Sequence, residues 1–131
     1  MKRDWILIKQ MLEAFENESF TAFLNKPYIS PEELSKCDSD EQIQELYRQK
    51  RLDVWKHLEL LMDCHVIENT QFDRENNNNG MRLTMYGHDL LDSIRDKAIW
   101  NKIISMTKDA GVALSWEVIK AAIPKAINSI L

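Results

Sequence analysis

The sequence predicts a mostly α-helical protein that carries one small β-hairpin. Apolar residues recur every three or four positions along most of the chain, which is the spacing of one face of an α-helix. Three glycines and three prolines in 131 residues leave few points at which a helix must break. Hydrophobic residues make up 44% of the chain, which is enough for one packed core and excludes a disordered chain.

The first predicted helix covers residues 3–18. Its apolar positions repeat at helical intervals: Trp5, Ile8, Met11 or Leu12, and Phe15. Residues 20–29 are rich in aromatic side chains, and Pro27 prevents a continuous helix there. We therefore expect this segment to be a connector that lies across the core.

Two further helices are predicted before residue 65. The first is short and begins with a capping box, made by Ser30, Pro31 and Glu33. Asp38 or Ser39 offers the next N-cap, and residues 40–64 keep the helical spacing without a glycine or proline. This segment is either one long helix or two helices broken near Gln49.

A hairpin is predicted after Cys64. Residues 66–72 are β-prone and residues 81–84 alternate in polarity, with the polar stretch Asp73 to Gly80 between them. Four consecutive asparagines and a glycine readily form turns, so we expect the tip to be mobile and exposed. It has no apolar residue to bury, so we also expect it to be dispensable for folding. Alternatively, the asparagines hydrogen-bond to nucleic acid or to a protein.

Three helices are predicted in the remainder of the chain. Thr84 is the N-cap of the first, which covers residues 85–96, and Gly111 ends the second, which covers residues 98–110. Ser115 caps the last helix, residues 116–131, in which Pro124 should produce a kink.

The order of helix, short helix, longer helix, hairpin and helix is that of a winged-helix module. We expect such a module over residues 1–96, with residues 97–131 as a helical extension packed on the same domain. The order of elements predicts a fold and does not by itself assign a function.

Three stretches carry a resemblance to a known family. They are residues 1–8 (MKRDWILI), residues 82–96 (RLTMYGHDLLDSIRD) with Trp100 after them, and residues 114–120 (LSWEVIK). These stretches resemble the family called domain of unknown function 2513, short proteins of bacteria and of their phages and prophages. The resemblance implies a winged-helix-like fold and a mobile-element setting, and it brings no catalytic residue.

Charge limits any nucleic-acid surface to a small area. The formal net charge is −4, which argues against a general polyanion binder. The candidate DNA-binding residues are the cations of the long helix and of the hairpin, namely Arg48, Lys50, Arg51, Lys56, Arg74 and Arg82. Acidic residues flank this cluster, so an ordinary solvated helix face is the competing interpretation.

Neither catalysis nor a metal site is predicted. Cys37 and Cys64 are 27 positions apart and are expected to be free thiols of a cytoplasmic protein. The histidines have no partner at a metal-binding spacing, and the isolated glycines form no phosphate loop. We expect no cofactor, no membrane span and no enzyme activity.

The tryptophans and the last helix raise the question of association. Core packing is the favoured role for all four tryptophans. The last helix nevertheless carries an apolar band wider than one domain must cover, including Trp116, Ile123, Ile127, Ile130 and Leu131. These residues are the candidate self-association surface of a homodimer.

The sequence favours a non-enzymatic, phage-type DNA-binding regulator with duplex DNA as its partner. The alternative is a protein-binding adaptor or inhibitor of a host defence system, whose partner is a host protein. The two differ in electrostatics: a DNA binder needs its cations on one surface, whereas an adaptor leaves them scattered among carboxylates.

Overall fold

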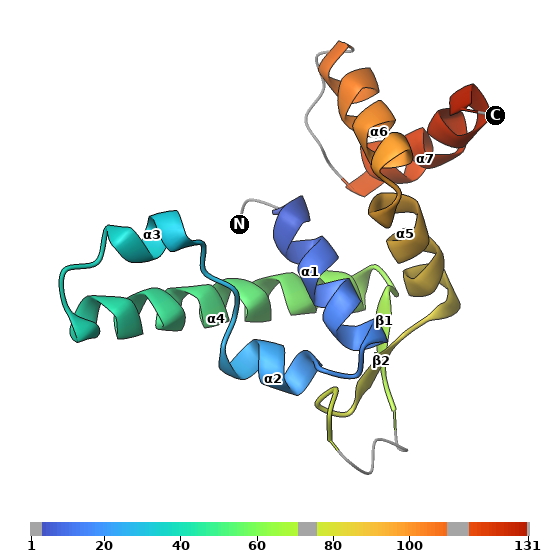
Figure 1. Ribbon diagram of the computed structural model, residues 1–131. Helices are drawn as coiled ribbons and strands as arrows, with labels where there is room; N and C mark the ends of the chain where they lie inside the picture. The colour runs from blue at the N-terminus through green and yellow to red at the C-terminus, as the bar shows by residue number, and fades with distance from the viewer. Residues whose placement is uncertain (1–3, 71–75, 110–115, 131) are drawn as a thin grey trace. The chain divides into compact units, whose positions relative to one another are not determined.

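A computed structural model describes residues 4–70, 76–109 and 116–130 (Figure 1). The described chain is mainly helical, with one pair of short antiparallel strands, as the sequence predicts. In chain order its elements are α1 (Trp5–Glu16), α2 (Phe20–Asn25), α3 (Pro31–Ser35), α4 (Asp40–Asp63), β1 (Ile67–Asn69), β2 (Met81–Leu83), α5 (Met85–Arg95), α6 (Lys97–Asp109) and α7 (Trp116–Ile130).

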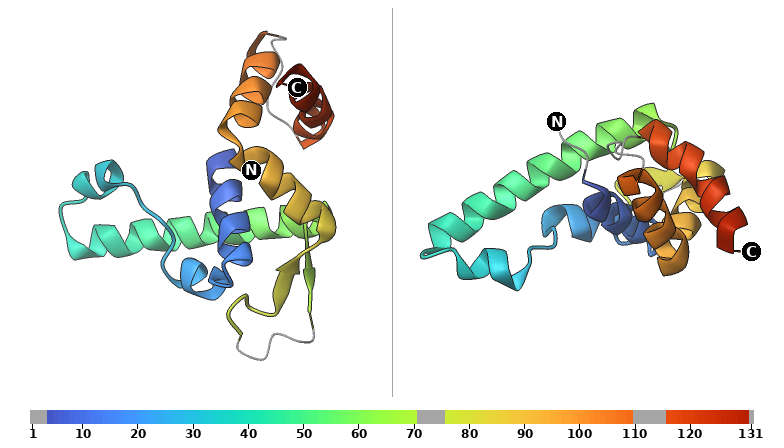
Figure 2. Two further views of the ribbon diagram at one scale, coloured as in Figure 1. Left: turned by 45° about the vertical axis from the view of Figure 1, so that its right-hand side comes forward. Right: turned by 90° about the horizontal axis from the view of Figure 1, so that it is seen from above.

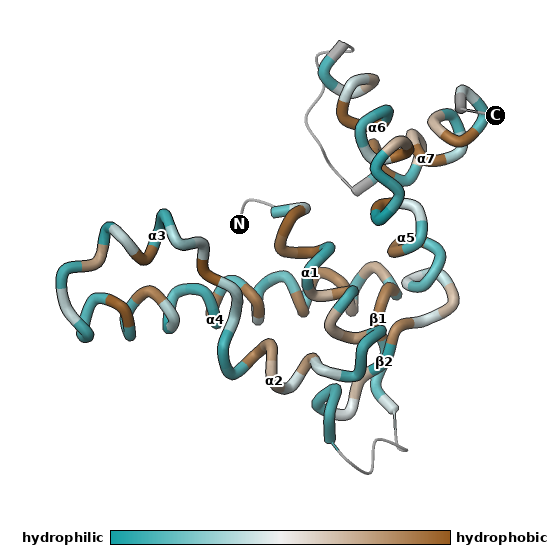
Figure 3. Tube along the Cα trace, viewed as in Figure 1, coloured by the Kyte–Doolittle hydropathy of each residue, from teal (hydrophilic) through white to brown (hydrophobic). Residues whose placement is uncertain are grey.

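The chain divides into two compact units, and the boundary between them lies between His88 and Asp89. The first unit has a core built on α1, α2, α4 and the hairpin. Its largest fully buried side chains are apolar and come from all of these elements: Ile8, Met11, Leu12, Phe20, Val54, Leu61, Val66 and Ile67. Figure 3 shows this concentration of hydrophobic residues along α1 and β1.

Local capping chemistry sets the helix starts as the sequence predicts. The hydroxyl of Ser30 accepts a hydrogen bond from the Glu33 amide, and that of Ser39 accepts one from the Gln42 amide. Helix α3 therefore begins at Pro31, and α4 runs unbroken from Asp40 to Asp63, which excludes a break near Gln49. Two views show α3 beside the N-terminal half of α4 (Figure 2).

The segment after α1 contains a helix that the sequence pattern does not reveal. Residues 20–25 form the six-residue α2, and its first side chain, Phe20, is fully buried and stacks on Phe15 at 4.1 Å between ring centroids. A helix of this length is too short to show a repeat in the sequence. Pro27 lies beyond its end, as expected.

Asn76, Asn77 and Asn79 of the tip are exposed as expected, but hydrogen bonds that the sequence does not predict join the tip to α2. The Asn78 side chain accepts a hydrogen bond from the Phe20 amide at 3.2 Å and donates one to the Phe15 carbonyl at 3.0 Å. Thr21 donates its hydroxyl to the Asn76 carbonyl at 2.6 Å and its amide to the Asn77 carbonyl at 2.7 Å. The turn thus supplies the N-terminal capping groups of α2 from 58 residues away.

The hairpin shows the predicted alternation in its second strand. Ile67 pairs with Leu83, and Glu68 pairs with Arg82, so apolar residues face the core while charged ones face solvent. Thr84 then caps α5 by accepting a hydrogen bond from the Gly87 amide at 3.0 Å. A Cβ atom at Gly87 would overlap with the carbonyl oxygen of Val66, so only glycine allows this close approach.

The second unit contains α6, α7 and most of α5. Asp96 caps α6 through the amides of Ala98 and Ile99, and α6 packs against α7. Its buried side chains in these two helices are Ile103, Thr107, Ile119, Ala122 and Ala126. Pro124 lies inside α7, whereas Gly111 and Ser115 lie outside the described residues.

In the part of the chain that the structure describes, no helix is long and apolar enough to cross a membrane. The winged-helix assignment and the packing of residues 97–131 on the rest of the chain stay predictions.

Candidate functional site

Helix α4 presents two different faces. Its inner face buries Val54, His57, Leu58 and Leu61 in the core of the first unit. Its opposite face carries five residues spaced alternately by three and four positions, which places them within about 80° of arc on one side of the helix. We call this set the outer stripe: Glu45, Arg48, Leu52, Trp55 and Glu59.

The outer stripe exposes a pair of large apolar side chains. Leu52 is 42% exposed and Trp55 is 46% exposed, and they lie one helical turn apart between charged residues. The core position expected for Trp55 is therefore wrong. Apolar residues occur on both faces of α4, so helical spacing alone does not say which face is buried.

One end of the outer stripe is held by a two-point ion pair. The guanidinium of Arg48 donates from Nε and Nη2 to the two carboxylate oxygens of Glu45, at 2.9 and 2.7 Å. These hydrogen bonds, with a further one from the Gln49 side chain, lower the pKa of Glu45 to about 2. Glu45 therefore remains ionised and neutralises Arg48 at every physiological pH.

Two of the other predicted DNA-binding cations, Lys50 and Arg82, are paired with carboxylates away from Arg48. Lys50 lies about 160° around α4 from Arg48 and forms an ion pair with Glu33 of α3 at 3.1 Å. The hydrogen bond from Lys50 lowers the pKa of Glu33. On the hairpin, Arg82 forms an ion pair with Glu68 at 2.8 Å. Lys56, on α4, is exposed, and Arg74 lies outside the described residues.

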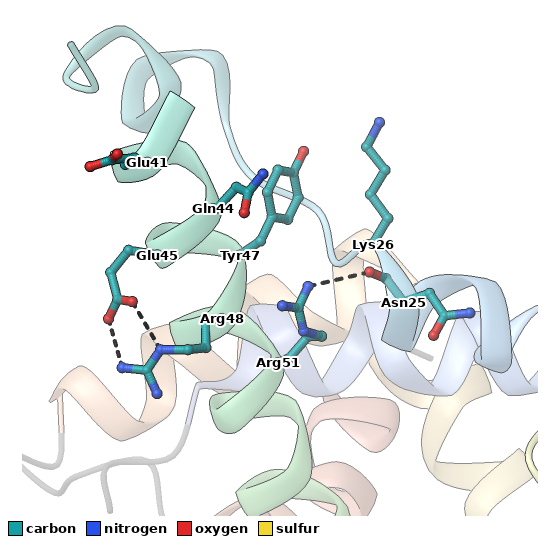
Figure 4. Close-up of a pocket in the computed structure, with 8 residues that line it drawn as sticks. All are labelled: Asn25, Lys26, Glu41, Gln44, Glu45, Tyr47, Arg48 and Arg51. Atoms are coloured by element: carbon teal, nitrogen blue, oxygen red, sulfur yellow. Dashed lines mark hydrogen bonds and ion pairs between the residues drawn. The ribbon is translucent and has the colours of Figure 1, made fainter. Parts of the chain in front are cut away.

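Arg48 and Arg51 both line one groove of about 600 Å³, which is formed by α4 and the end of α2 (Figure 4). Arg51 reaches across it, and its Nη1 atom lies 3.5 Å from the Asn25 carbonyl oxygen. The groove has a mixed charge, because three cations and two carboxylates line it: Lys26, Arg48, Arg51, Glu41 and Glu45. Its surface therefore lacks the uniform positive potential that attracts phosphate.

His57 has a structural role on the inner face. It is 3% exposed, its Nε2 atom accepts a hydrogen bond from the Asp4 amide at 2.9 Å, and its Nδ1 atom donates to the Asp53 carbonyl at 2.7 Å. Nowhere in residues 4–70, 76–109 and 116–130 do three or more His, Cys, Asp or Glu side chains gather as a metal site would require.

The predicted self-association band lies on α7. Ile123 and Ile127 are half-buried beside the fully covered Ala122 and Ala126 of the same helix. The side chains of Trp116 and Ile130, together with Leu131, are outside what the structure describes. The band thus contributes in part to the packing of its own unit.

Comparisons with known proteins agree with the resemblance noted in the sequence. The chain is 28% identical over 133 residues to an uncharacterized protein of Haemophilus influenzae, and the match covers 100% of this chain and 99% of that protein. No solved structure matches the chain. Residues 2–113 match the family described as Hypothetical protein (DUF2513), domain of unknown function 2513. The chain belongs to this family.

Proposed function

We propose that this protein is a non-catalytic protein-binding module whose contact surface is the outer stripe of α4. The observation that carries the proposal is the paired exposure of Leu52 and Trp55 on a long, well-capped helix. Tryptophan is enriched among the residues that dominate protein–protein binding energy, especially at the centre of a contact. Here the charged residues Arg48 and Glu59 lie on either side of the apolar pair, as the polar rim of an interface does.

The electrostatics support a protein partner more than a nucleic acid. Three of the six candidate cations already form ion pairs with carboxylates: Arg48, Lys50 and Arg82. DNA affinity depends on the number of phosphates neutralised, and a cation already paired with a carboxylate contributes less to that number. Cations scattered among carboxylates are the pattern expected of an adaptor.

A DNA-binding regulator is the second candidate. It is favoured by one observation, namely that Lys26, Arg48 and Arg51 line the same groove. The finer proposals that the protein acts for a phage or prophage and meets a host protein rest on the family resemblance. The proposal that it is cytoplasmic rests on the expectation that its two cysteines are free thiols. Homodimer formation through the α7 band likewise remains a proposal.

Site-specific photo-crosslinking tests the proposed surface. With p-benzoylphenylalanine in place of Trp55, irradiation of cells that produce the protein should yield covalent adducts with protein. The adducts should disappear when Arg48→Glu is added. The matched control places the same photo-crosslinker at Tyr28, an exposed aromatic residue of the same unit that lies off α4. Equal adducts at both positions would contradict the proposal.

Duplex binding supplies the opposing test. We expect that neither Arg48 nor Arg51 contributes to binding of a random-sequence duplex at low salt. If Arg48→Ala and Arg51→Ala each weaken duplex binding and lower its salt slope by about 1, the cations neutralise phosphates. That result would replace the protein-binding proposal with the DNA-binding one.

A further inference from the structure

The charge pattern of the outer stripe identifies the kind of partner it fits, and this inference rests on the proposed function. We propose that the outer stripe binds the outer stripe of a second copy of this chain, with the two α4 helices antiparallel about a two-fold axis. The axis passes between Leu52 and Trp55, so each Leu52 packs on the partner's Trp55. The alternating three- and four-residue spacing is that of helices that pair along their length.

The register that pairs the apolar residues also pairs opposite charges. Arg48 lies four residues before Leu52, and Glu59 lies four residues after Trp55. In an antiparallel pair these equal offsets place Arg48 opposite the partner's Glu59 at both ends of the apolar centre. Arg48 then lies between two carboxylates, its own Glu45 and the partner's Glu59, which suits a guanidinium with five N–H donors.

A parallel pair lacks this complementarity. In a parallel two-fold pair each residue meets its own copy, so Arg48 would face Arg48 and Glu59 would face Glu59. Like charges directly opposed across an interface destabilise it. Of the three other cations of this region, Lys50 pairs with Glu33 on another side of α4, and Arg51 and Lys56 flank the outer stripe on opposite sides and stay at the rim.

The helix can support such a contact without refolding. Its N-terminus is capped by Ser39, and its inner face is anchored by buried residues from Val54 to Leu61. One helix pair is smaller than a standard interface of about 1,600 Å², so we expect a reversible dimer at micromolar concentration.

Charge-swap variants of the full chain test the proposal. Sedimentation velocity over roughly 1 to 100 µM should show the parent mass rising from 15.4 kDa toward twice that value. Arg48→Glu and Glu59→Arg should each weaken association at least about tenfold, because two-fold symmetry makes each substitution count twice. The double variant Arg48→Glu, Glu59→Arg should regain the parent's association, because opposite charges again face each other.

Two controls separate loss of the contact from loss of the fold. Trp55→Ala should weaken association, whereas Tyr28→Ala, at an aromatic side chain that is 59% exposed elsewhere in the same unit, should not. Thermal unfolding followed by circular dichroism should show one cooperative transition for the parent and for each charge variant, since the substituted side chains are exposed. Only the variants that carry Arg48→Glu should shift the transition slightly downward, because they lose the ion pair with Glu45.

The outcomes distinguish this inference from the proposed function. A parent that remains monomeric at every concentration overturns the second-copy inference. In that case crosslinks from position 55 to a different protein still support the protein-binding module. Association that is unchanged in both single charge variants overturns the inference as well, and moves the dimer contact to another surface such as the α7 band.

Discussion

The attachment of the asparagine turn to α2 predicts that one side chain on the hairpin stabilises the whole first unit. Asn78→Ala removes two hydrogen bonds, one from the Phe20 amide at 3.2 Å and one to the Phe15 carbonyl at 3.0 Å. Both partners are partly buried at the corner between α1 and α2. Since each hydrogen bond contributes about 1 kcal/mol, the free energy of unfolding should fall by about 2 kcal/mol.

Urea titration followed by far-ultraviolet circular dichroism measures this loss. The matched control is Asn76→Gly, because Asn76 has a φ of 55° that glycine adopts easily and offers Thr21 its backbone carbonyl. The control should change the free energy of unfolding by less than about 0.5 kcal/mol. If Asn78→Ala lowers the free energy of unfolding no more than the control does, the turn does not hold α2 and the two hydrogen bonds contribute no net stability.

Three further substitutions test individual contacts. Gly87→Ala should lower the free energy of unfolding by at least about 2 kcal/mol, because its Cβ meets the rigid Val66 backbone, and a neutral result in urea titration would refute that overlap. His57→Ala should cost about 2–4 kcal/mol, since it leaves a core cavity and strips the Asp4 amide of its acceptor; calorimetry that finds a loss below about 1 kcal/mol would contradict this role. The lowered pKa of Glu45 means that its ion pair contributes stability above pH 4.5 and loses it as the pH falls toward 2. Glu45→Gln should therefore reduce the loss of unfolding free energy between pH 4.5 and about 2. An unchanged pH profile of the unfolding free energy would show that the ion pair contributes nothing.

Local chemistry made much of the fold predictable from the sequence. Ser30 and Thr84 cap the helices that they were predicted to cap, and of the two candidates Asp38 and Ser39 it is Ser39 that caps α4. Such caps are predictable because a hydroxyl and the amides it binds lie within three residues of each other. Helical spacing located α1 and α4, because burying one face of a long helix requires a repeat that the sequence must show.

The features that the sequence analysis missed depend on contacts between distant residues. The cap of α2 comes from Asn78, 58 positions after Phe20, so no window of the sequence contains both partners. The exposure of Trp55 depends on which face of α4 the core covers, and both faces carry apolar residues. The alternation of Glu45, Arg48, Leu52, Trp55 and Glu59 is visible in the sequence, but only a structure shows that this stripe is exposed.

Mixing two complementary charge variants tests the central claim most directly. Arg48→Glu and Glu59→Arg chains should each be largely monomeric alone, because like charges oppose each other at both ends of the pair. Mixed in equal amounts, they should form a one-to-one heterodimer, since each contact then joins opposite charges. Native mass spectrometry with one variant isotopically labelled distinguishes this heterodimer from either homodimer. A mixture that remains monomeric while the parent dimerises would contradict the antiparallel pairing of α4.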